Sequence, residues 1–455
     1  MSNNDKLASK MKAIVGEANV IEDPEKLKAY AVDGEAPGLF VAPGTIEETS
    51  KVVACANAEK RSVVPMGSGT KMGLGGILKK KADILLSTRR MNRIADYDIA
   101  NLTLGVECGL TLAEVQEKLA GEGRGYFIPL DPPYSREATI GGIVATNDSG
   151  PKRFIYGAAR DVILGVKAVM PNGDIVVSGG KAVKNVAGYD MTKMMIGSMG
   201  ALGIICEVIF RIYPKPDAEA TLLLPFGTLN EAAGYLKMLL HSKFFPASME
   251  LMNAKAASGI TAAAGLKGPY VAAIGLEGIE EAVARQIAEL GDLGRKGGAL
   301  DVVTLKDQAH RDFWTAYRDL TGTAAKSSPN LVDLKSNFVL SKVPEMVMAF
   351  EAALKDASME GALTCRAGNG ILYAAISPGA DAAAKAAAVA SMVERLTAES
   401  VKQGGNLVVQ GAPRAIKEKL SVWGKTRSDA VLVRRLKEKL DPSGILNPGR
   451  FVAGV

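Results

Sequence analysis

Short apolar runs separated by glycine-rich turns dominate the first half of the chain. Apolar runs at 39–42, 62–64, 84–86 and 102–106 predict buried strands. Residues 112–119 instead carry apolar side chains at helical spacing, which predicts a helix. The pattern therefore indicates a mixed fold with short strands in its interior.

A hairpin and a pair of prolines end this half. Strand patterns at 165–170 and 175–177 flank a Pro-Asn-Gly-Asp turn at 171–174. Residues 202–212 form a long apolar strand, and Pro-Lys-Pro at 214–216 then interrupts the chain. We expect a domain boundary at these prolines.

The second half alternates strands with longer helices. Strands are predicted at 222–224, 248–252, 270–276, 338–340 and 371–376, and helices at 229–241, 279–290, 344–354, 381–403 and 431–440. Two such β-α-β-like units indicate an antiparallel sheet covered by helices. Proline and glycine after residue 440 predict an ordered C-terminal loop.

Composition excludes several classes of protein. The chain has 455 residues, a net charge of +6 and 5% aromatic residues, so a nucleic-acid surface is not expected. No apolar run is long enough to span a membrane, and the polar start does not look like a signal peptide. We expect a cytoplasmic protein that reaches the inner membrane only through partners.

The segment 65–76 is the strongest candidate for chemistry. It has five glycines in twelve residues and follows a predicted strand. Glycines let successive N–H groups form a concave anion site, so the segment predicts a diphosphate-binding loop. A surface turn is the alternative, because neither the P-loop nor the G-x-G-x-x-G pattern fits.

Three further segments of small residues follow in a fixed order. The first is Asp-Pro-Pro-Tyr-Ser at 131–135 with Ala-Thr-Ile-Gly-Gly at 138–142. The second is Tyr-Gly-Ala-Ala-Arg-Asp at 156–161, and the third is Ala-Gly-Tyr-Asp-Met-Thr-Lys at 187–193. Tight turns around a sheet do not explain four such segments at these spacings.

In this order the segments resemble the FAD-binding domain of the vanillyl-alcohol oxidase and p-cresol methylhydroxylase superfamily. The ending Leu-Asp-Pro-Ser-Gly-Ile-Leu-Asn-Pro-Gly-Arg-Phe at 440–451 is similar to the glycolate oxidase and D-lactate dehydrogenase branch. The resemblance implies an α+β fold. It has a two-subdomain FAD-binding domain over 1–217 (subdomains about 1–95 and 96–217), a cap domain over 218–410 with an antiparallel sheet covered by helices, and a C-terminal segment over 411–455 that returns to the FAD domain.

The resemblance also implies which residues hold FAD. The expected contacts are Pro65, Met66, Gly67, Ser68, Gly69, Thr70, Lys71, Met72, Gly73, Pro132, Ser135, Thr139, Gly141, Gly142, Ala145, Asn147, Ser149, Tyr156, Gly203, Ile204, Ile205 and Asn447. Neither His241 nor His310 lies in these segments, so we expect non-covalent FAD.

Two motifs of the branch's catalytic subunits are replaced. Where H-x-G-D-G-N-x-H is expected, Arg366 and Tyr373 occupy the histidine positions, and Val-Val-Gln-Gly-Ala-Pro at 408–413 replaces G-E-H-G-x-G. Arginine neither accepts a proton at neutral pH nor ligates a divalent cation, so no metal site is expected. These replacements resemble the second, non-histidine FAD subunit of bacterial glycolate oxidases.

Three side chains are candidates for catalysis or substrate binding: Arg318, Arg366 and Tyr373. An arginine fork suits the carboxylate of a small 2-hydroxy or 2-oxo acid, and Tyr373 could carry a proton. Lys335 is a further anion binder. The alternatives are interdomain ion pairs for the cations and a buried structural role for Tyr373.

Three hypotheses remain. The chain is an FAD subunit that relays electrons from 2-hydroxy-acid oxidation to an iron–sulfur subunit, with a second FAD subunit as a further candidate partner. Alternatively, it is a self-sufficient FAD dehydrogenase, or a structural subunit that has lost FAD. Four glycine-rich segments argue against the last.

Overall fold

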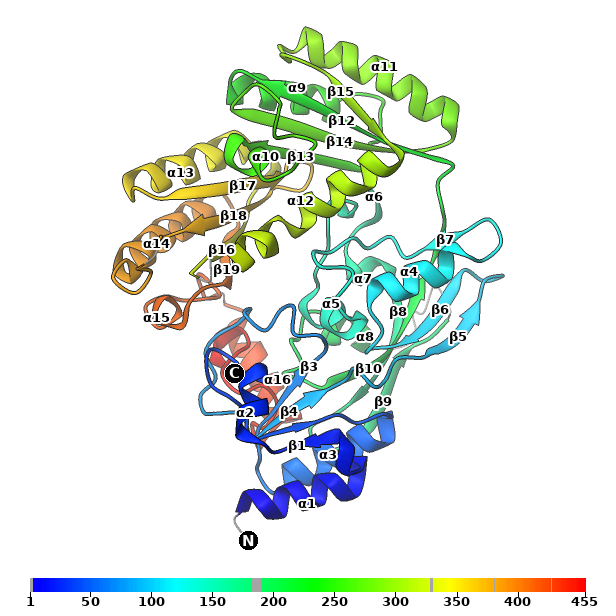
Figure 1. Cartoon of the computed structure of the whole chain (residues 1–455), viewed down its shortest axis with the longest axis vertical. Coiled ribbons are helices and arrows are strands. Elements are labelled where there is room, and N and C mark those ends of the chain that lie inside the picture. Colours follow the sequence, from blue (N-terminus) through cyan, green and yellow to red (C-terminus); the bar gives the residue numbers. More distant parts are fainter. Residues whose placement is uncertain (1–2, 182–189, 328–329, 380, 427) are drawn as a thin grey trace.

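The computed structural model describes residues 3–181, 190–327, 330–379, 381–426 and 428–455. Figure 1 shows two lobes stacked along the long axis, with the first half of the chain and the C-terminus in one lobe and the green-to-orange part in the other. Two large hydrophobic clusters match this division. One spans Leu7 to Ile212 and includes Ile445 and Leu446, and the other spans Ala220 to Val422. We call them the N-terminal lobe and the sheet lobe.

The described part of the N-terminal lobe forms two main sheets and a short two-stranded pair of β7 (Tyr126–Phe127) with β11 (Tyr213–Pro214). The first has the order β1-β2-β4-β3, with parallel pairing of β2 with β4 and of β3 with β4. Its elements are α1 (Asn3–Val15), β1 (Val20–Ile21), β2 (Leu39–Val41), α3 (Ile46–Ala58), β3 (Val63–Met66) and β4 (Ile84–Ser87). Thr45 caps the N-terminus of α3, because its hydroxyl accepts a hydrogen bond from the Glu48 amide.

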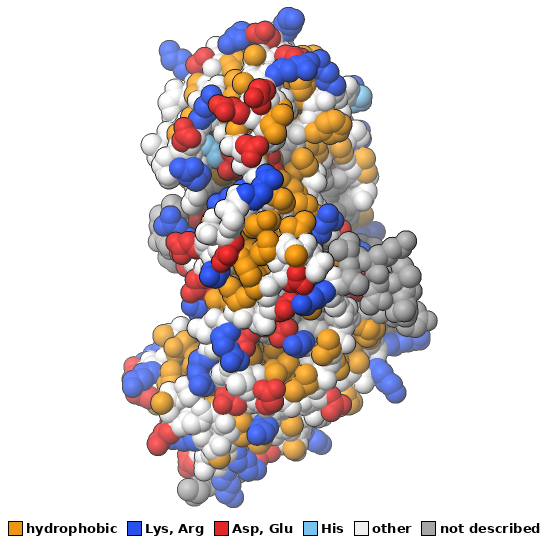
Figure 2. Space-filling model, turned by 90° about the vertical axis from the view of Figure 1, so that its right-hand side faces the viewer, with side chains coloured by type: hydrophobic (Ala, Val, Ile, Leu, Met, Phe, Trp, Pro, Cys, Tyr) orange, Lys and Arg blue, Asp and Glu red, His pale blue; other side chains and the backbone are white. Residues whose placement is uncertain are grey.

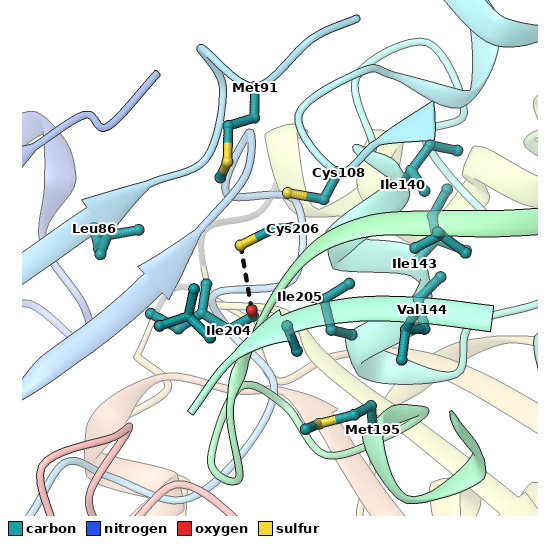
Figure 3. Close-up of a cluster of buried hydrophobic side chains, with 14 of the residues drawn as sticks. Leu86, Met91, Cys108, Ile140, Ile143, Val144, Met195, Ile204, Ile205 and Cys206 are labelled. Atoms are coloured by element: carbon teal, nitrogen blue, oxygen red, sulfur yellow. Dashed lines mark hydrogen bonds between the residues drawn. The ribbon is translucent and has the colours of Figure 1, made fainter. Parts of the chain in front are cut away.

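The second sheet of this lobe is antiparallel, with the order β5-β6-β10-β8-β9. Its elements are β5 (Ile94–Asp98), β6 (Thr103–Glu107), α4 (Leu112–Ala120), α5 (Ile140–Thr146), β8 (Ile163–Val169), β9 (Ile175–Gly179) and β10 (Ile204–Arg211). Figure 3 shows Ile140, Ile143 and Val144 of α5 beside Ile204 and Ile205 in one buried cluster. This packing fixes α5 and the start of β10 against each other.

One eight-stranded antiparallel sheet forms the sheet lobe, in the order β15-β12-β14-β13-β17-β18-β16-β19. Its strands are β12 (Ala218–Phe226), β13 (Ser248–Asn253), β14 (Tyr270–Gly278), β15 (Val303–Lys306), β16 (Val332–Asn337), β17 (Glu360–Arg366), β18 (Ile371–Ser377) and β19 (Asn406–Gly411). Helices α9 (Leu229–Leu240), α11 (Glu280–Lys296), α13 (Val343–Asp356) and α14 (Ala386–Lys402) supply apolar side chains to its main cluster.

The opposite face of this sheet is partly covered by α10 (Ala254–Ser258) and α12 (Asp307–Ser327). Because side chains alternate along a strand, β16 buries Val332 and Leu334 in the main cluster and turns Asp333 and Lys335 to the other face. Asp333 and Lys335 each line a pocket that Lys71 and Asp148 of the N-terminal lobe also line. A row of polar side chains therefore faces the junction of the lobes.

The C-terminal segment crosses back to the N-terminal lobe. After α16 (Ala430–Leu440), Ile445 and Leu446 join its hydrophobic cluster. The Val63 amide donates to the Ile445 carbonyl at 2.8 Å, and the Asn447 amide donates to the Val63 carbonyl at 2.9 Å. The tail thus pairs with β3, the strand that leads into the glycine loop.

Most predicted elements are present, but one strand was wrong. Residues 338–340 follow β16 rather than forming a strand, and Leu340 opens a short 3₁₀ turn. The predicted helix at 381–403 begins only at Ala386. The mixed helix and sheet architecture with a helix-covered antiparallel sheet is confirmed.

Charges of both signs are mixed over the visible surface. Figure 2 shows blue and red side chains interspersed over the visible face, with a band of hydrophobic side chains near its middle. Within the described ranges, none of the helices has the length and apolar character needed to cross a bilayer.

Candidate functional site at the junction of the lobes

In the loop after β3, successive backbone donors find no acceptor among the described residues. Within the part of the chain that the structure describes, the amides of Gly67, Ser68, Gly69 and Thr70 donate no hydrogen bond. Gly69 has a φ of +82°, a conformation that favours glycine. Such successive free N–H groups form a concave site for an anion.

Gly67 also lets the loop approach α5 closely. A Cβ atom at this position would lie 2.0 Å from Thr139 Oγ1. Thr139 cannot easily move away, because its hydroxyl accepts a hydrogen bond from the Gly142 amide at the start of α5. Only glycine therefore fits between the loop and this cap.

A cavity lies between the glycine loop, α5 and the start of β10, with about 740 Å³ of free space when its open mouth is included. Most of the residues predicted to contact the cofactor line it: Pro65, Met66, Gly67, Ser68, Gly69, Thr70, Lys71, Met72, Thr139, Gly141, Gly142, Ala145, Gly203, Ile204, Ile205 and Asn447. These residues come from distant parts of the sequence and line one cavity.

Six predicted cofactor residues do not line this cavity: Gly73, Pro132, Ser135, Asn147, Ser149 and Tyr156. The Tyr156 hydroxyl bonds Glu277 of the sheet lobe instead. Asn147 ends α5 in a left-handed conformation. Ser149 is buried, and its hydroxyl has no partner among the described residues. Of the third segment at 187–193, residues 187–189 lie outside the described residues.

The C-terminal tail closes the cavity. The Asn447 side chain donates through Nδ2 to the Met199 carbonyl at 2.6 Å, while its buried Oδ1 has no partner in the described part of the chain. Arg450, which is 2% exposed, donates to the carbonyls of Met72 and Leu74. The tail thereby holds the far side of the glycine loop.

Arg450 was missed as a site residue by sequence reasoning. The signal for it was the Asn-Pro-Gly-Arg-Phe ending at 447–451, which was used for Asn447 alone. Because Arg450 acts on backbone carbonyls of a segment 376 residues away, only the fold reveals this role.

Two pockets adjoin the cavity where the lobes meet, with about 900 and 480 Å³ of free space when their openings are included. We call them together the junction chamber. Lys71 lines the cavity and both pockets, so the glycine loop connects them. Lys71 Nζ lies 2.7 Å from Asp148 Oδ2. Burial opposes both charges, but their mutual attraction wins, raising the Lys71 pKa and lowering that of Asp148.

All three candidate catalytic residues line the smaller pocket of the chamber. The guanidinium of Arg366 lies over the Tyr373 ring at 4.7 Å, and Arg366 is 5% exposed. Arg366 Nη1 and Tyr373 Oη have no hydrogen-bond partner in the described residues. Burial opposes the Arg366 charge, but Tyr373 and nearby carboxylates outweigh it and raise its pKa.

Arg318 sits at the wall of this pocket on α12. Its Nη1 lies 4.0 Å from Asp131 Oδ2 of the N-terminal lobe, and its Nη2 donates to Thr315 Oγ1. This long ion pair across the lobes matches the structural alternative considered for Arg318. The residue also borders a further pocket between the lobes.

Lys335 and Arg153 add positive charge to the larger pocket of the chamber. Lys335 of β16 pairs with Tyr373 on the neighbouring strand β18, and its Nζ lies 5.6 Å from the centre of the Tyr373 ring. Burial and repulsion by Arg366 lower the pKa of Arg153. No ion pair of either cation with a carboxylate is present in the described ranges. Arg153 was not predicted, and no motif indicated it.

Neither histidine reaches the chamber. His310 is buried, and its Nδ1 bonds Thr221 Oγ1 at 2.8 Å, whereas His241 lies at the end of α9 and bonds the Lys237 carbonyl. The described residues also contain no group of three or more His, Cys, Asp or Glu side chains placed to hold a metal ion. The ionisable groups that line the chamber are therefore lysines, arginines, carboxylates and the phenols of Tyr317 and Tyr373.

The cavity fits a ligand with a diphosphate and extended ring systems. Residues 67–70 line it, and among the described residues their amides have no acceptor and Asn447 Oδ1 has no donor. A side chain at Gly67 would collide with Thr139. Unpartnered buried polar groups cost free energy unless a ligand or water satisfies them. FAD has the groups that this arrangement lacks.

Comparisons with known proteins agree with this geometry. A model described as "FAD binding domain" matches residues 37–179, and one described as "FAD linked oxidases, C-terminal domain" matches residues 215–451. The chain is 28% identical to the glycolate oxidase subunit GlcD of Bacillus subtilis, over 92% of this chain and 89% of that protein.

Two other relatives and one solved structure are similar over most of their length. A D-2-hydroxyglutarate dehydrogenase of Xanthomonas citri pv. viticola is 28% identical, over 94% of this chain and 93% of its own. The mitochondrial D-lactate dehydrogenase [cytochrome] of Arabidopsis thaliana is 26% identical, over 91% of this chain and 73% of that protein. p-Cresol methylhydroxylase has the same fold. Its structure matches with a TM-score of 0.78 at 16% identity, over 99% of this chain and 97% of its own.

Proposed function

Because this chain belongs to the FAD-linked oxidase family, we propose that it oxidises a 2-hydroxy acid in the junction chamber as the flavoprotein subunit of a glycolate oxidase or D-lactate dehydrogenase-like complex. The observation that carries the proposal is the pairing of a cavity suited to FAD with an adjoining pocket in which Arg366 Nη1 and Tyr373 Oη have no hydrogen-bond partner among the described residues. The relatives named for glycolate, D-lactate and D-2-hydroxyglutarate support the substrate class.

FAD is held non-covalently in this proposal. The amides of residues 67–70 bind its diphosphate, and Thr139, Ile204 and Asn447 line the remainder of its site. When bound, FAD supplies the two-electron acceptor for an alcohol oxidation and can pass electrons on to a partner. No histidine lies in the cavity lining to form a covalent link.

Arg366 binds the substrate carboxylate. Its stacking on Tyr373 holds the guanidinium plane while leaving Nη1 free to donate, which suits a charge-assisted bond to a carboxylate. The Tyr373 hydroxyl donates to a substrate oxygen. Arg318 supports this pocket from α12 and holds Asp131 across the lobe junction.

An iron–sulfur protein is the proposed electron acceptor, with a second FAD subunit as a further partner. The similar Bacillus protein is itself named a subunit. Cytoplasmic location, with membrane contact only through partners, fits a chain whose described helices include none long and apolar enough to span a bilayer.

The test combines purification from the native host with cofactor analysis. FAD and iron should co-purify with the chain, and acid precipitation should release the flavin into the supernatant. A yellow pellet would contradict non-covalent binding. Iron-free, monomeric protein that turns over 2-hydroxy acid would instead favour the second candidate.

That second candidate is a self-sufficient dehydrogenase without a metal site. The pocket with Arg366 and Tyr373 favours it, since this chain alone supplies those groups. A structural subunit without FAD is disfavoured, because it gives no reason for the unpartnered amides of residues 67–70. Purified protein that neither contains nor rebinds FAD would revive it.

A further inference from the structure

One carboxylate in the junction chamber has no assigned role. Asp333 lies on β16, on the face that the strand turns toward the N-terminal lobe, and it lines the same pocket as Arg366 and Tyr373. Its buried Oδ1 has no hydrogen-bond partner among the described residues. A buried carboxylate oxygen without a donor is costly, so it calls for an explanation.

We propose that Asp333 accepts the hydroxyl proton of the 2-hydroxy acid during its oxidation. The proposal rests on the proposed function. The O–H bond of the substrate breaks and its proton goes to Asp333 Oδ1, while the hydrogen of the adjacent C–H bond leaves with its electron pair to FAD. The alcohol carbon becomes a carbonyl, and the product is a 2-oxo acid.

Other groups in the chamber are less suited to this role. Asp148 is paired with Lys71 at 2.7 Å, which lowers its pKa and keeps it ionised and engaged. Arg366 cannot accept a proton, and neither pocket of the chamber is lined by a histidine. Glu250 does not line either pocket and already accepts a hydrogen bond from Tyr317.

The surroundings of Asp333 bring its pKa close to neutral pH. Burial raises its pKa to about 7, with Asp148 adding to the rise and Lys71 and Lys335 opposing it. The groups that face it or share its pocket are Lys71 and Asp148 from the N-terminal lobe, Lys335 from its own strand, Arg366 and Tyr373 from β17 and β18, and Tyr317 and Arg318 from α12. A base with a pKa near the working pH is efficient in proton transfer.

Asp333→Asn tests this assignment in the FAD-loaded protein, with Asp292→Asn on the outer helix α11 as the matched control. We expect D333N to keep its FAD and its thermal midpoint but to lose roughly 10²- to 10⁴-fold in kcat/KM. The wild-type kcat/KM should rise with pH through about 7 and then level off. D333N should lose this inflection, and D292N should keep it.

Binding of a 2-oxo acid supplies a readout that needs no turnover, with pyruvate and 2-oxoglutarate as the probes. In the wild type, binding should weaken as pH rises through 7, because an ionised Asp333 repels the anion. D333N should bind at least as tightly, without this pH dependence. Loss of FAD or of 2-oxo acid binding in D333N would make Asp333 structural and overturn the proposal.

The failures are distinguishable. If the wild type oxidises a 2-hydroxy acid and D333N keeps both its rate and its pH inflection, the assignment of Asp333 is wrong and the proposed function stands. If no 2-hydroxy acid reacts although the bound flavin is chemically reducible, the proposed function fails and takes the proton transfer with it.

Discussion

The guanidinium carbon of Arg366 lies 4.7 Å from the centre of the Tyr373 ring, across the antiparallel pair formed by β17 and β18. Most buried arginines are held by carboxylates. Here an aromatic face takes that place, so Arg366 Nη1 stays available. The arrangement keeps a buried cation ready for an anionic ligand.

Replacing this cation should impair substrate binding more than FAD binding. Arg366→Gln removes the charge-assisted bond, so we expect KM for the 2-hydroxy acid to rise roughly 10- to 100-fold. Tyr373→Phe keeps the aromatic face and removes only the hydroxyl, so its effect should be smaller. Steady-state kinetics and flavin content of both variants check this, and an unchanged KM in R366Q would remove Arg366 from the substrate site.

A single methyl group should block the cofactor cavity. Gly67→Ala places a Cβ about 2.0 Å from Thr139 Oγ1, so the glycine loop and α5 must separate. We expect the purified variant to lose most of its FAD. Gly234→Ala on α9 is the matched control, because nothing lies within 4 Å of the added Cβ. That control should keep its flavin and gain about 0.5–1 kcal/mol in stability.

The buried pair Lys437–Asp441 should stabilise the tail that carries Asn447. Lys437 Nζ lies 2.6 Å from Asp441 Oδ2 and donates to the carbonyls of Ala201 and Leu446. Lys437→Met leaves Asp441 buried and unpaired, which costs about 3–5 kcal/mol. Urea unfolding should show this loss, together with weaker FAD retention.

Lys439→Met serves as the control for that experiment, because Lys439 is exposed on the same helix. It should change the free energy of unfolding by less than about 0.5 kcal/mol. Equal effects of the two substitutions would mean that the buried pair does not anchor the tail.

Glu250 should make stability fall as the pH rises. Burial raises the pKa of Glu250 to about 8, although Arg366 and the Tyr317 hydrogen bond oppose the rise. In the unfolded chain its pKa is ~4.3, so the folded protein binds this proton more tightly. The stability that it contributes is complete below pH ~4 and is lost as the pH rises through about 8.

Glu250→Gln replaces the titrating carboxyl group with a neutral amide, whose oxygen can still accept the hydrogen bond from Tyr317. The loss of stability with rising pH should therefore be smaller in this variant. Thermal midpoints measured at several pH values between 5 and 9 check the difference between E250Q and the wild type. Identical pH profiles would show that Glu250 does not titrate in this range.

The sequence predicted the cofactor side of the site better than the substrate side. Glycines in the 65–76 loop and the residues around Thr139 form continuous motifs, and their roles depend on local backbone shape. Asp333 and Arg153 gave no such signal, because each enters the chamber through the packing of the two lobes. The incorrect strand at 338–340 has a related cause. In β16, alternate polar residues face the chamber and interrupt the apolar run. The strand was therefore predicted from the apolar residues that follow it, at 338–340, and not at Val332–Asn337.

Helix α12 shows the same limit. Its apolar face, with Phe313, Trp314 and Tyr317, packs on the open face of the sheet and joins a small cluster of its own. Arg318 on this helix could be proposed from the sequence only as an anion binder. Its ion pair with Asp131 requires the second lobe to be in place.

Anaerobic reduction of the bound flavin tests the central claim most directly. The FAD-loaded chain is mixed with glycolate, D-lactate or D-2-hydroxyglutarate, and the flavin absorbance is followed by stopped flow. At least one of these acids should bleach the flavin in the wild type and bleach it far more slowly in R366Q. If none bleaches a flavin that dithionite readily reduces, this chain does not oxidise 2-hydroxy acids.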